Sequence, residues 1–473
     1  MESAGVVELL LGLQFDGLGP VVVSEFFERH RDLATVRGRR GARREHGILR
    51  CARPTRGMRA AAASPRRIGY LRAMGGVRVG IVGSGFLAET RARCWKRVRG
   101  AAVAGVASRT PESAASFAAA HDLPVTFEAP ADLFRSDAID VVDLCVPNRW
   151  HRSLAEAAAS AGKHVICTKP LTAYVGQDLG EAADPAGVGA RDRRAMYAAA
   201  VADARAMTAA CDDAGVRLLY AENWLHAPGF VRAASLLERA DAAILEMRGW
   251  ECHSGSHSRY AKQWAQTGGG ALLRLAAHPL GAMLWLKRAE GLRRDGTAIV
   301  PVAVAAEVAD LTQVRGADAR NTRIATGWED VENWGCAMVG FSDGSRATAI
   351  GSDNTLGGME SRLELYGSNC QLKCNLSPND LVRAYAPDAA VFGDAVLQEK
   401  LDTGAGWSTP MADEDWTSGQ QPMLQSFADA LAGGEAVAGD GALGTDVTRV
   451  LYAAYVSAAE GGRVTLEQLD RLP

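Results

Sequence analysis

The sequence predicts an α/β Rossmann domain followed by an α+β domain whose sheet is open and mostly antiparallel. Three observations support this fold class. Apolar runs alternate with alanine-rich helical segments from Val77 to Asn223, a glycine-rich turn follows the first run, and strand-like segments with short connections prevail after Trp224. A length of 473 residues agrees with more than one domain. We place the segment boundaries at 1–74, 75–223 and 224–473.

The composition excludes several classes of protein. Hydrophobic residues make up 48% and charged residues 23% of the chain, which indicates a folded protein. No apolar run reaches the roughly 18 residues that span a bilayer, so we expect no membrane association. A net charge of −3 disfavours nucleic-acid binding. The nine scattered cysteines favour a reduced, cytoplasmic protein.

Residues 1–74 differ from the rest of the chain. Residues 1–73 hold 14 arginines, no lysine and seven acidic residues, and no helical or strand periodicity is sustained between Arg29 and Arg72. A basic arm for an anionic partner is one interpretation. A targeting signal is disfavoured, because no apolar core or small-residue cleavage site follows the paired arginines. We instead expect this Arg-rich leader to be disordered or not native, with Met74 as the natural start, because the chain's 45 arginines against 7 lysines indicate a GC-rich coding sequence, in which upstream DNA also translates into arginine-rich peptide.

The first strand and its turn form a nucleotide-binding pattern. Val77 to Val82 is a short apolar run typical of a buried parallel strand, and G-x-G-x-x-A follows it. Gly83 permits the tight turn, Gly85 lets the backbone approach a pyrophosphate, and Ala88 allows close packing of helix and strand. The N-terminus of the next helix attracts the phosphates. The residues expected to contact the cofactor here are Gly83, Ser84, Gly85, Phe86, Leu87 and Ala88.

The second apolar run, 101–108, ends where the ribose of a dinucleotide is read. Ser108 and Arg109 occupy this position, and no acidic residue is there to bind the 2′-hydroxyl of NAD. A guanidinium pairs well with a 2′-phosphate. The expected cofactor is therefore NADP or NAD, with NADP favoured, and a solvated loop arginine is the alternative.

Three further strands are expected at 140–147, 163–170 and 216–223, with helices between them. Ligands of parallel sheets bind beyond the carboxyl ends of the strands. Pro147, Asn148 and His151 follow one such end, and we assign them to the cofactor; the alternative for His151 is a cap of the helix that follows. Lys169 lies at the carboxyl end of the next strand, 163–170.

The second domain is expected to begin near Trp224. Its strand-like segments are 242–253, 302–314, 333–353 and 361–377, and Asp343-Gly344 is typical of a hairpin turn. Gly180 to Arg194 is longer than a crossover needs and is interpreted as a surface insertion.

Five segments in order carry a resemblance to a known family: GSGFLA (83–88), VPNRWH (146–151), AGKHVICTKPL (161–171), YAEN (220–223) and GGGALLRLAAHPL (268–280). Together they resemble the glucose–fructose oxidoreductase, inositol dehydrogenase and rhizopine-catabolism family (Gfo/Idh/MocA). The resemblance extends from Val77 onward, with a C-terminal helix expected at 446–459. It implies a hydride-transferring enzyme that forms a homodimer or homotetramer.

The resemblance also implies site residues. The family's E-K-P motif supplies a lysine at the nicotinamide and the substrate hydroxyl, which corresponds to Lys169, although Thr168 replaces the glutamate. The family's Asp and His positions are Arg274 and His278, and Ala276 replaces the intervening glycine. These departures imply a divergent substrate.

The same residue types suit alcohol oxidation. A histidine can accept the hydroxyl proton at neutral pH, and a lysine can stabilise developing alkoxide charge. We therefore expect Lys169 and His278 to be catalytic, and the substrate to meet Lys169, Glu222, Asn223, Arg274 and His278. In a continuous helix Arg274 would lie on the same face as His278 and keep its imidazole neutral, although Pro279 opposes that conformation.

Other residues have interpretations that need no ligand. His253 and His257 have metal-like spacing, but the glycine and serine residues around them favour a loop, so we predict no metal site. Trp264 and Tyr260 either line a sugar site or belong to the core.

These observations predict an NAD(P)-dependent oxidoreductase that acts on a secondary hydroxyl of a sugar, polyol or glycoside. The alternative is a non-catalytic nucleotide-binding regulator of the same fold.

Overall fold

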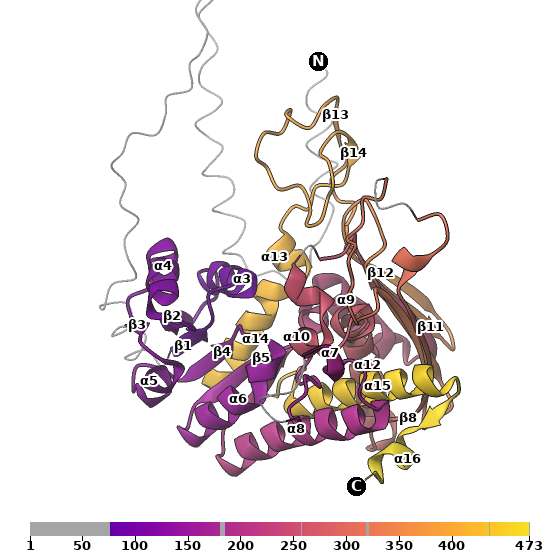
Figure 1. Cartoon of the computed structure of the whole chain (residues 1–473), viewed down its shortest axis with the longest axis horizontal. Helices are drawn as coiled ribbons and strands as arrows, with labels where there is room; N and C mark the ends of the chain where they lie inside the picture. The colour runs from indigo at the N-terminus through magenta and orange to yellow at the C-terminus, as the bar shows by residue number, and fades with distance from the viewer. Residues whose placement is uncertain (1–75, 180–184, 257, 318–320, 435, 473) are drawn as a thin grey trace, which may run out of the picture. The chain divides into compact units, whose positions relative to one another are not determined.

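The structure is a computed structural model that describes residues 76–473 except 180–184, 257, 318–320, 435 and 473 (Figure 1). The predictions for the Arg-rich leader, for His257 and for the first part of the Gly180–Arg194 insertion lie outside the described residues. No helix within the described ranges has both the length and the apolar character that a bilayer crossing requires.

The first sheet is parallel and has the strand order β3-β2-β1-β4-β5-β6. Its strands are β1 (Val77–Val82), β2 (Ala101–Ala107), β3 (Thr126–Phe127), β4 (Val141–Leu144), β5 (His164–Thr168) and β6 (Leu218–Ala221). All five strand pairs are parallel. The strand order reverses between β1 and β4, which is where nucleotides bind in such sheets. The predicted Rossmann sheet is confirmed.

Helices follow these strands because alanine-rich segments pack closely on a buried sheet. They are α3 (Phe86–Trp95), α4 (Pro111–His121), α5 (Pro130–Arg135), α6 (His151–Ser160) and α8 (Arg193–Asp213). Every residue of β2 is buried, as expected of a strand covered on both faces. Thr110 begins α4 by accepting a hydrogen bond from the Ser113 amide, and Asp192 begins α8 similarly through the Ala195 amide.

The second sheet is larger and has the order β12-β11-β7-β10-β9-β8-β15. Its strands are β7 (Ile244–Cys252), β8 (Pro301–Ala309), β9 (Trp334–Phe341), β10 (Arg346–Ser352), β11 (Glu360–Gly367), β12 (Gln371–Ser377) and β15 (Val464–Thr465). β7 and β10 run parallel, and the other neighbouring strands run antiparallel. The predicted hairpin joins β9 to β10, with Gly344 at φ +89°.

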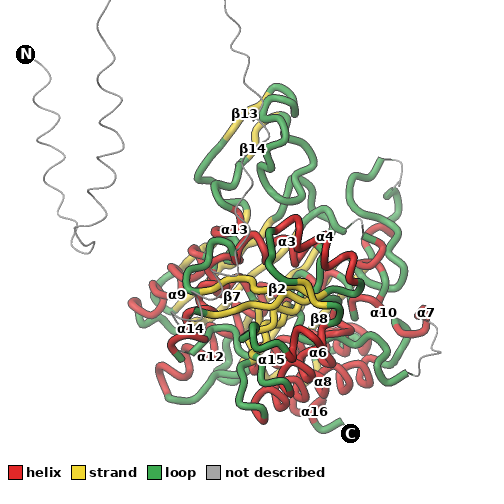
Figure 2. Tube along the Cα trace, turned by 90° about the vertical axis from the view of Figure 1, so that its left-hand side faces the viewer, coloured by secondary structure: helices red, strands yellow, loops and turns green. Residues whose placement is uncertain are grey.

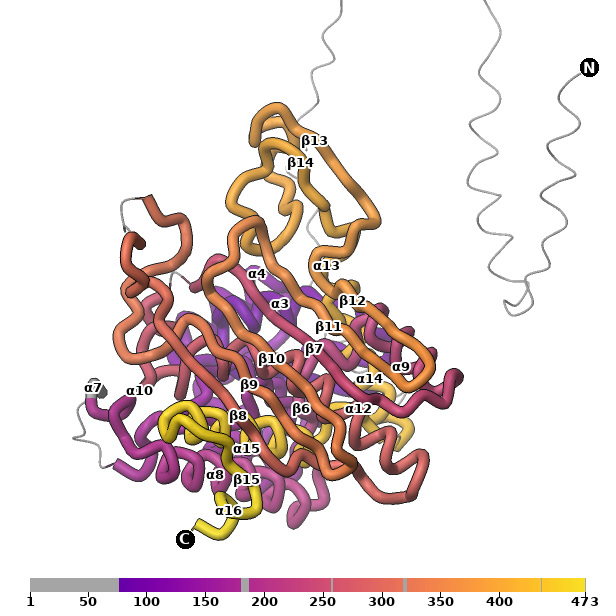
Figure 3. The backbone as a smooth tube through the Cα atoms, turned by 90° about the vertical axis from the view of Figure 1, so that its right-hand side faces the viewer, coloured from indigo at the N-terminus to yellow at the C-terminus, as the bar shows by residue number. Residues whose placement is uncertain are grey.

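Most of the remaining helices pack against the second sheet, and one of them, Gln420–Gly433, packs against the first. They are α7 (Pro185–Val188), α9 (Pro228–Ala240), α10 (Trp264–Thr267), α11 (Ala271–Arg274), α12 (Ala277–Asp295), α13 (Glu414–Thr417), α14 (Gln420–Gly433), α15 (Gly441–Glu460) and α16 (Leu466–Asp470). In Figure 3 the strands lie in front of α8, α12 and α15, so the opposite face of the sheet is open among the described residues. The C-terminal helix expected at 446–459 is α15.

A projecting segment carries a small third sheet. β13 (Ala384–Ala386) pairs with β14 (Gly406–Ser408), and both stand away from the two large sheets in Figures 1 and 2. The segment ends near α13, and residues on its flanks line the main cavity described below.

The C-terminal part of the chain returns to the first sheet. Met423, Leu424 and Phe427 of α14 are fully buried in the same apolar cluster as Val79 and Ile81 of β1. The Gly439 carbonyl also accepts a hydrogen bond from the Tyr220 amide of β6 at 2.9 Å. Residues far apart in sequence therefore build the core beneath the nucleotide-binding edge.

Candidate active site

One cavity of about 750 Å³ lies where the two large sheets meet. The carboxyl ends of β5, β6 and β7 and the start of α3 contribute to its wall. The side chains that matter for chemistry are Phe86, Leu87, Lys169, Asn223, Trp224, Glu251, His253 and His278. Predicted cofactor and substrate residues thus share one wall, together with residues from the second sheet that the sequence analysis did not single out.

Lys169 is fixed at the end of β5. Its Nζ donates a hydrogen bond to the Arg274 carbonyl oxygen at 2.5 Å. Burial lowers the pKa of Lys169, while the carboxylates of Glu222 and Glu251 act to raise it. An ammonium held this way has further donors for an oxygen in the cavity.

Glu222 and His278 form a buried pair. The Glu222 Oε1 lies 2.7 Å from His278 Nδ1 and also accepts a hydrogen bond from the Trp224 amide at 3.1 Å. A carboxylate can only accept, so Nδ1 carries the proton and Nε2 of a neutral ring is left as a proton acceptor. The Trp224 indole lies nearly parallel to the imidazole, with an interplanar angle of 12° and ring centroids 6.0 Å apart.

Arg274 does not share a helical face with His278. The chain breaks at Leu275 and Ala276, between α11 and α12, and Arg274 instead pairs with Asp353 and lies over the Trp328 ring. Pro279 is accommodated in the first turn of α12, where its missing amide is not needed. The hypothesis that Arg274 acts on His278 is therefore wrong in its geometry. The charge of Arg274 instead lowers the pKa of Lys169 and His253.

The turn after β1 fits a dinucleotide. Gly83 has φ +120°, and a Cβ there would lie 2.2 Å from the Cys145 carbonyl oxygen. Gly85 begins α3 without a side-chain cap, and a Cβ there would meet nothing within 4 Å. The start of α3 thus has free space beside Gly85, where a phosphate group can approach the helix N-terminus. Ala88 is fully buried, as expected for close helix packing.

The expected ribose-reading residues lie at the end of β2. The Ser108 hydroxyl is 2.8 Å from the Ser84 hydroxyl, so these two side chains are engaged with each other. Arg109 is exposed just beyond them. Ser84 also lines a separate hollow of about 390 Å³ together with residues of α3 and α4.

The side chains of His151 and Asn148, which follow β4, mainly form hydrogen bonds within the protein. Both ring nitrogens of His151 lie 3.0 Å from backbone carbonyls, of Leu171 and Val146, and the side chain is fully buried. Asn148 donates to the Thr267 carbonyl at 2.9 Å. The expected cofactor contact of His151 is corrected: its side chain joins the ends of β4 and β5 and has no open face. Neither these two residues nor Pro147 lines the 750 Å³ cavity.

Three more residues complete the site: His253, which the sequence analysis considered only as a metal ligand or loop residue, and Glu251 and Asp353, which it missed. Glu251 and His253 lie at the carboxyl end of β7, and Asp353 follows β10. His253 Nδ1 accepts a hydrogen bond from the Gly255 amide at 2.9 Å, and burial together with nearby cations lowers the pKa of His253 to about 3. A charged residue at the carboxyl end of a strand was a usable signal, because Glu222 at the end of β6 was singled out at such a position.

The structure also locates the two aromatic residues that the sequence analysis placed either in a sugar site or in the core. Trp264 is buried and donates to the Tyr174 carbonyl, so it belongs to the core, while Tyr260 is partly exposed. Within the described ranges, no group of three or more His, Cys, Asp or Glu residues is arranged to hold a metal ion.

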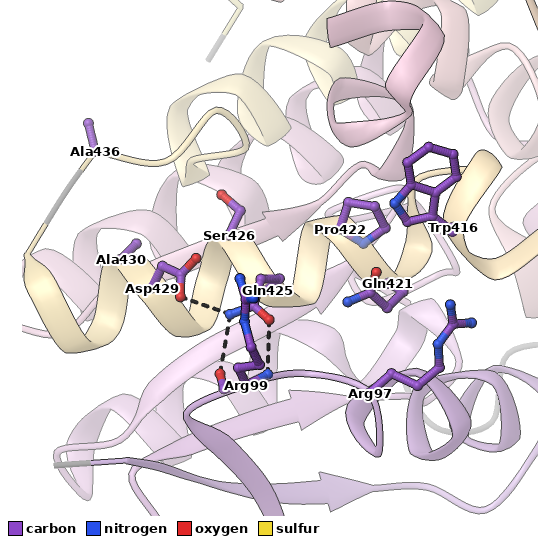
Figure 4. Close-up of a pocket in the computed structure, with 10 residues that line it drawn as sticks. All are labelled: Arg97, Arg99, Trp416, Gln421, Pro422, Gln425, Ser426, Asp429, Ala430 and Ala436. Carbon is purple, nitrogen blue, oxygen red and sulfur yellow. Dashed lines mark hydrogen bonds between the residues drawn. The ribbon is translucent and has the colours of Figure 1, made fainter. Parts of the chain in front are cut away.

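A second hollow, of about 540 Å³, lies between α14 and the turn before β2 (Figure 4). Gln425 bridges the main chain of Arg99 and the Asp429 carboxylate, as the dashed lines in Figure 4 show. Arg97 is paired with Asp413. The hollow contains none of the predicted site residues, and its polar groups mainly bind one another.

Comparison with known proteins agrees with this geometry. Residues 77–191 match the family model described as "Oxidoreductase family, NAD-binding Rossmann fold". D-apiose dehydrogenase of Paraburkholderia graminis is 28% identical over 35% of this chain and 36% of its own length. The chain therefore matches about a third of the length of that relative.

Two longer matches extend over both sheets. Levoglucosan dehydrogenase of Pseudarthrobacter phenanthrenivorans is 24% identical over 84% of this chain and all of its own length. The crystal structure of GenD2 from gentamicin A biosynthesis, in complex with NAD, superposes with a TM-score of 0.66 at 23% identity. That match covers 82% of this chain and 96% of GenD2, and it supports the fold of both domains.

Proposed function

We propose that this chain, which through residues 77–191 belongs to the Gfo/Idh/MocA oxidoreductase family with its NAD-binding Rossmann fold, is an NAD(P)-dependent dehydrogenase. Its substrate is a sugar, polyol or glycoside with a reactive secondary hydroxyl. The observation that carries the proposal is the convergence of Lys169 and the Glu222–His278 pair on one cavity wall beside the start of α3. The named relatives act on apiose and levoglucosan, which agrees with this substrate class.

The described residues fit the cofactor. Gly83 to Ala88 would hold the pyrophosphate at the start of α3, and Phe86, Leu87 and Lys169 would border the nicotinamide end. A bound nicotinamide supplies the hydride acceptor. Substrate binding, proton transfer and charge stabilisation are carried out by side chains of this chain.

Lys169 and His278 have different roles in the oxidation of the hydroxyl. Lys169 donates a hydrogen bond to the substrate oxygen and stabilises the negative charge that develops there. His278 Nε2 accepts the hydroxyl proton, and Glu222 stabilises the resulting imidazolium through Nδ1–H. Asn223 borders the substrate, although its amide nitrogen already donates to the Ser418 carbonyl at 2.6 Å. Arg274 positions Lys169, because its carbonyl oxygen accepts a hydrogen bond from Lys169 Nζ.

Hydride transfer can be tested by isotope labelling. The protein is incubated with NAD(P)⁺ and polyols deuterated at their secondary carbons, and the nicotinamide is analysed for deuterium. Label on the nicotinamide establishes the reaction. Nucleotide binding without label in any combination would favour the non-catalytic regulator.

We infer a preference for NADP from Arg109, which is exposed beyond β2 where no acidic residue follows the strand. GenD2 holds NAD, so the preference is a property to be measured in this chain. Replacement of Arg109 by Ala should weaken NADP binding about tenfold and leave NAD binding unchanged, as judged by fluorescence titration.

We propose that the protein is a cytoplasmic homodimer or homotetramer without a nucleic-acid partner. The open face of the second sheet supports the assembly, since Leu245 and Met338 on β7 and β9 are each 55% exposed. The eight described cysteines are all free, which agrees with a reducing compartment. We likewise propose that the substrate-binding and oligomerisation domain begins near residue 224. Light scattering at several concentrations tests the assembly.

A further inference from the structure

The substrate side of the 750 Å³ cavity holds an acidic group without a partner. Glu251 is only 2% exposed, yet it lines the cavity and its Oε2 has no hydrogen-bond partner. It faces Ser361 across β7 and β11. Burial raises the pKa of Glu251, and the hydrogen bond from the Ser361 hydroxyl only partly opposes that rise. A buried carboxylate oxygen left unpaired is costly, so this position points to a ligand.

The arginines around the cavity are already paired with other acidic residues. Arg93 forms a two-point pair with Asp415 at 2.6 and 2.7 Å. Arg274 pairs with Asp353, and Arg91 lies 3.9 Å from Asp143. Lys169 keeps its charge, because its hydrogen-bond partner is a neutral carbonyl, and that charge acts on both Glu222 and Glu251. No salt bridge among the described residues joins Glu251 to a cation, so Lys169 is its main compensating charge and is shared with a second carboxylate.

Two further acids border the same cavity. Glu399 and Glu414 both line it, and the Glu399 amide donates to the Glu414 carboxylate at 3.3 Å. Burial and then the negative charge of Glu399 raise the pKa of Glu414. With Glu222 behind His278, the cavity therefore holds more acidic groups than free cationic ones.

From this imbalance we infer that the substrate carries an ammonium group, as an amino sugar, aminocyclitol or aminoglycoside does, and that Glu251 binds it. The inference rests on the proposed function and names its substrate class. A hydroxyl would give Glu251 a hydrogen bond but no compensating charge, whereas an ammonium supplies both. Glu251 interacts electrostatically with Lys169 and His278, so the amine belongs close to the reacting hydroxyl.

The test compares matched ligands on the protein–NAD(P)⁺ complex. D-glucosamine is compared with D-glucose and N-acetyl-D-glucosamine, and streptamine with scyllo-inositol. Acetylation removes the charge and keeps the position, as it does for lysine. Binding is followed by isothermal titration, and turnover by the absorbance of the reduced nicotinamide.

At least one amine should bind about tenfold or more tightly than its neutral partners, and Glu251→Gln should abolish that preference while retaining nucleotide affinity. Glu246→Gln is the control, because Glu246 lies on the same strand but is exposed and pairs with Arg248. Equal binding of amines and neutral partners, or a preference that survives in Glu251→Gln, would overturn the inference and leave the dehydrogenase proposal intact. Absence of nucleotide binding by the wild-type protein would instead overturn the proposed function.

Discussion

A single hydrogen bond decides which nitrogen of His278 can accept a proton. Because the Glu222 carboxylate accepts from Nδ1–H at 2.7 Å, Nε2 is the basic atom. In Glu222→Gln the amide can donate to Nδ1 and stabilise the opposite tautomer. We expect kcat to fall on the order of 10²- to 10⁴-fold with unchanged nucleotide affinity, measured by steady-state kinetics and fluorescence titration. A wild-type kcat in this variant would remove Glu222 from the mechanism.

His253 makes stability depend on pH. Its pKa is lowered from 6.5 to about 3, by burial first and then by Arg274, Lys400 and Lys169. Asp353 lies 3.5 Å from its Nδ1 but is already paired with Arg274. The unfolded chain therefore binds a proton below pH 6.5 that the folded chain does not, so stability is lost as pH falls from 6.5 toward 3.

The variant His253→Gln should flatten this dependence by up to about 1.4 kcal/mol per pH unit, because one proton is no longer taken up on unfolding. Urea unfolding at several pH values between 4 and 6 measures the slope. His226, whose pKa burial lowers to about 4, provides an independent comparison through His226→Gln. An unchanged slope in His253→Gln would show that this residue does not stay neutral in the folded protein.

The residues that sequence reasoning located and missed differ in one physical respect. Lys169 and His278 stand in recognisable local patterns. Glu251 instead reaches the cavity only because β7 ends there, and Asp353 finds Arg274 only in the folded chain. His151 had a local pattern but not the expected role, because its burial depends on Leu171 from the next connection.

At the scale of elements, we expect the two glycines of the turn between β1 and α3 to have different roles: Gly83 is needed for stability and Gly85 for nucleotide binding. Gly83 has φ +120° and no room for a Cβ beside Cys145, whereas Gly85 has φ −91° and open space. Gly83→Ala should destabilise the protein by about 1–3 kcal/mol from backbone strain alone. Gly85→Ala should change stability by less than about 1 kcal/mol and weaken nucleotide binding about tenfold or more.

Thermal unfolding and nucleotide titration of the two variants distinguish these effects. If Gly85→Ala bound nucleotide as tightly as the wild type, the start of α3 would not be the phosphate site. The break between α11 and α12 could not be foreseen in the same way. No helix-breaking residue stands at Leu275 or Ala276, and Pro279 lies inside α12 rather than at the break. The position of the break depends on tertiary contacts such as the Glu332 side chain, which accepts from the Leu272 amide.

At the scale of the whole molecule, the two sheets were predictable because their strands have different hydrophobic patterns. The parallel strands of the first sheet are continuous apolar runs, whereas apolar and polar residues alternate along the strands of the second sheet. The return of α14 to β1 and α3 was not predictable, since its apolar positions do not specify which sheet they cover. This return predicts that residues 75–223 alone do not fold.

Without Met423, Leu424 and Phe427, the fragment exposes apolar surface that the whole chain buries. Phe427→Ala in the whole chain should lower the free energy of unfolding by about 3–5 kcal/mol. Circular dichroism and nucleotide binding of the fragment provide the measurement. A fragment that folds and binds nucleotide would show that α14 is dispensable for the first sheet.

The most direct measurement is turnover by the wild type, Lys169→Ala and His278→Asn, followed as reduced nicotinamide with the sugar and amino-sugar panel, alongside nucleotide titration of each protein. The wild type should reduce NADP⁺ or NAD⁺ with at least one substrate, and both variants should bind nucleotide but lose turnover at least 100-fold, on the order of a general acid–base contribution. Wild-type turnover in either variant, or nucleotide binding without any turnover by the wild type, would contradict the assignment of this cavity as a dehydrogenase active site.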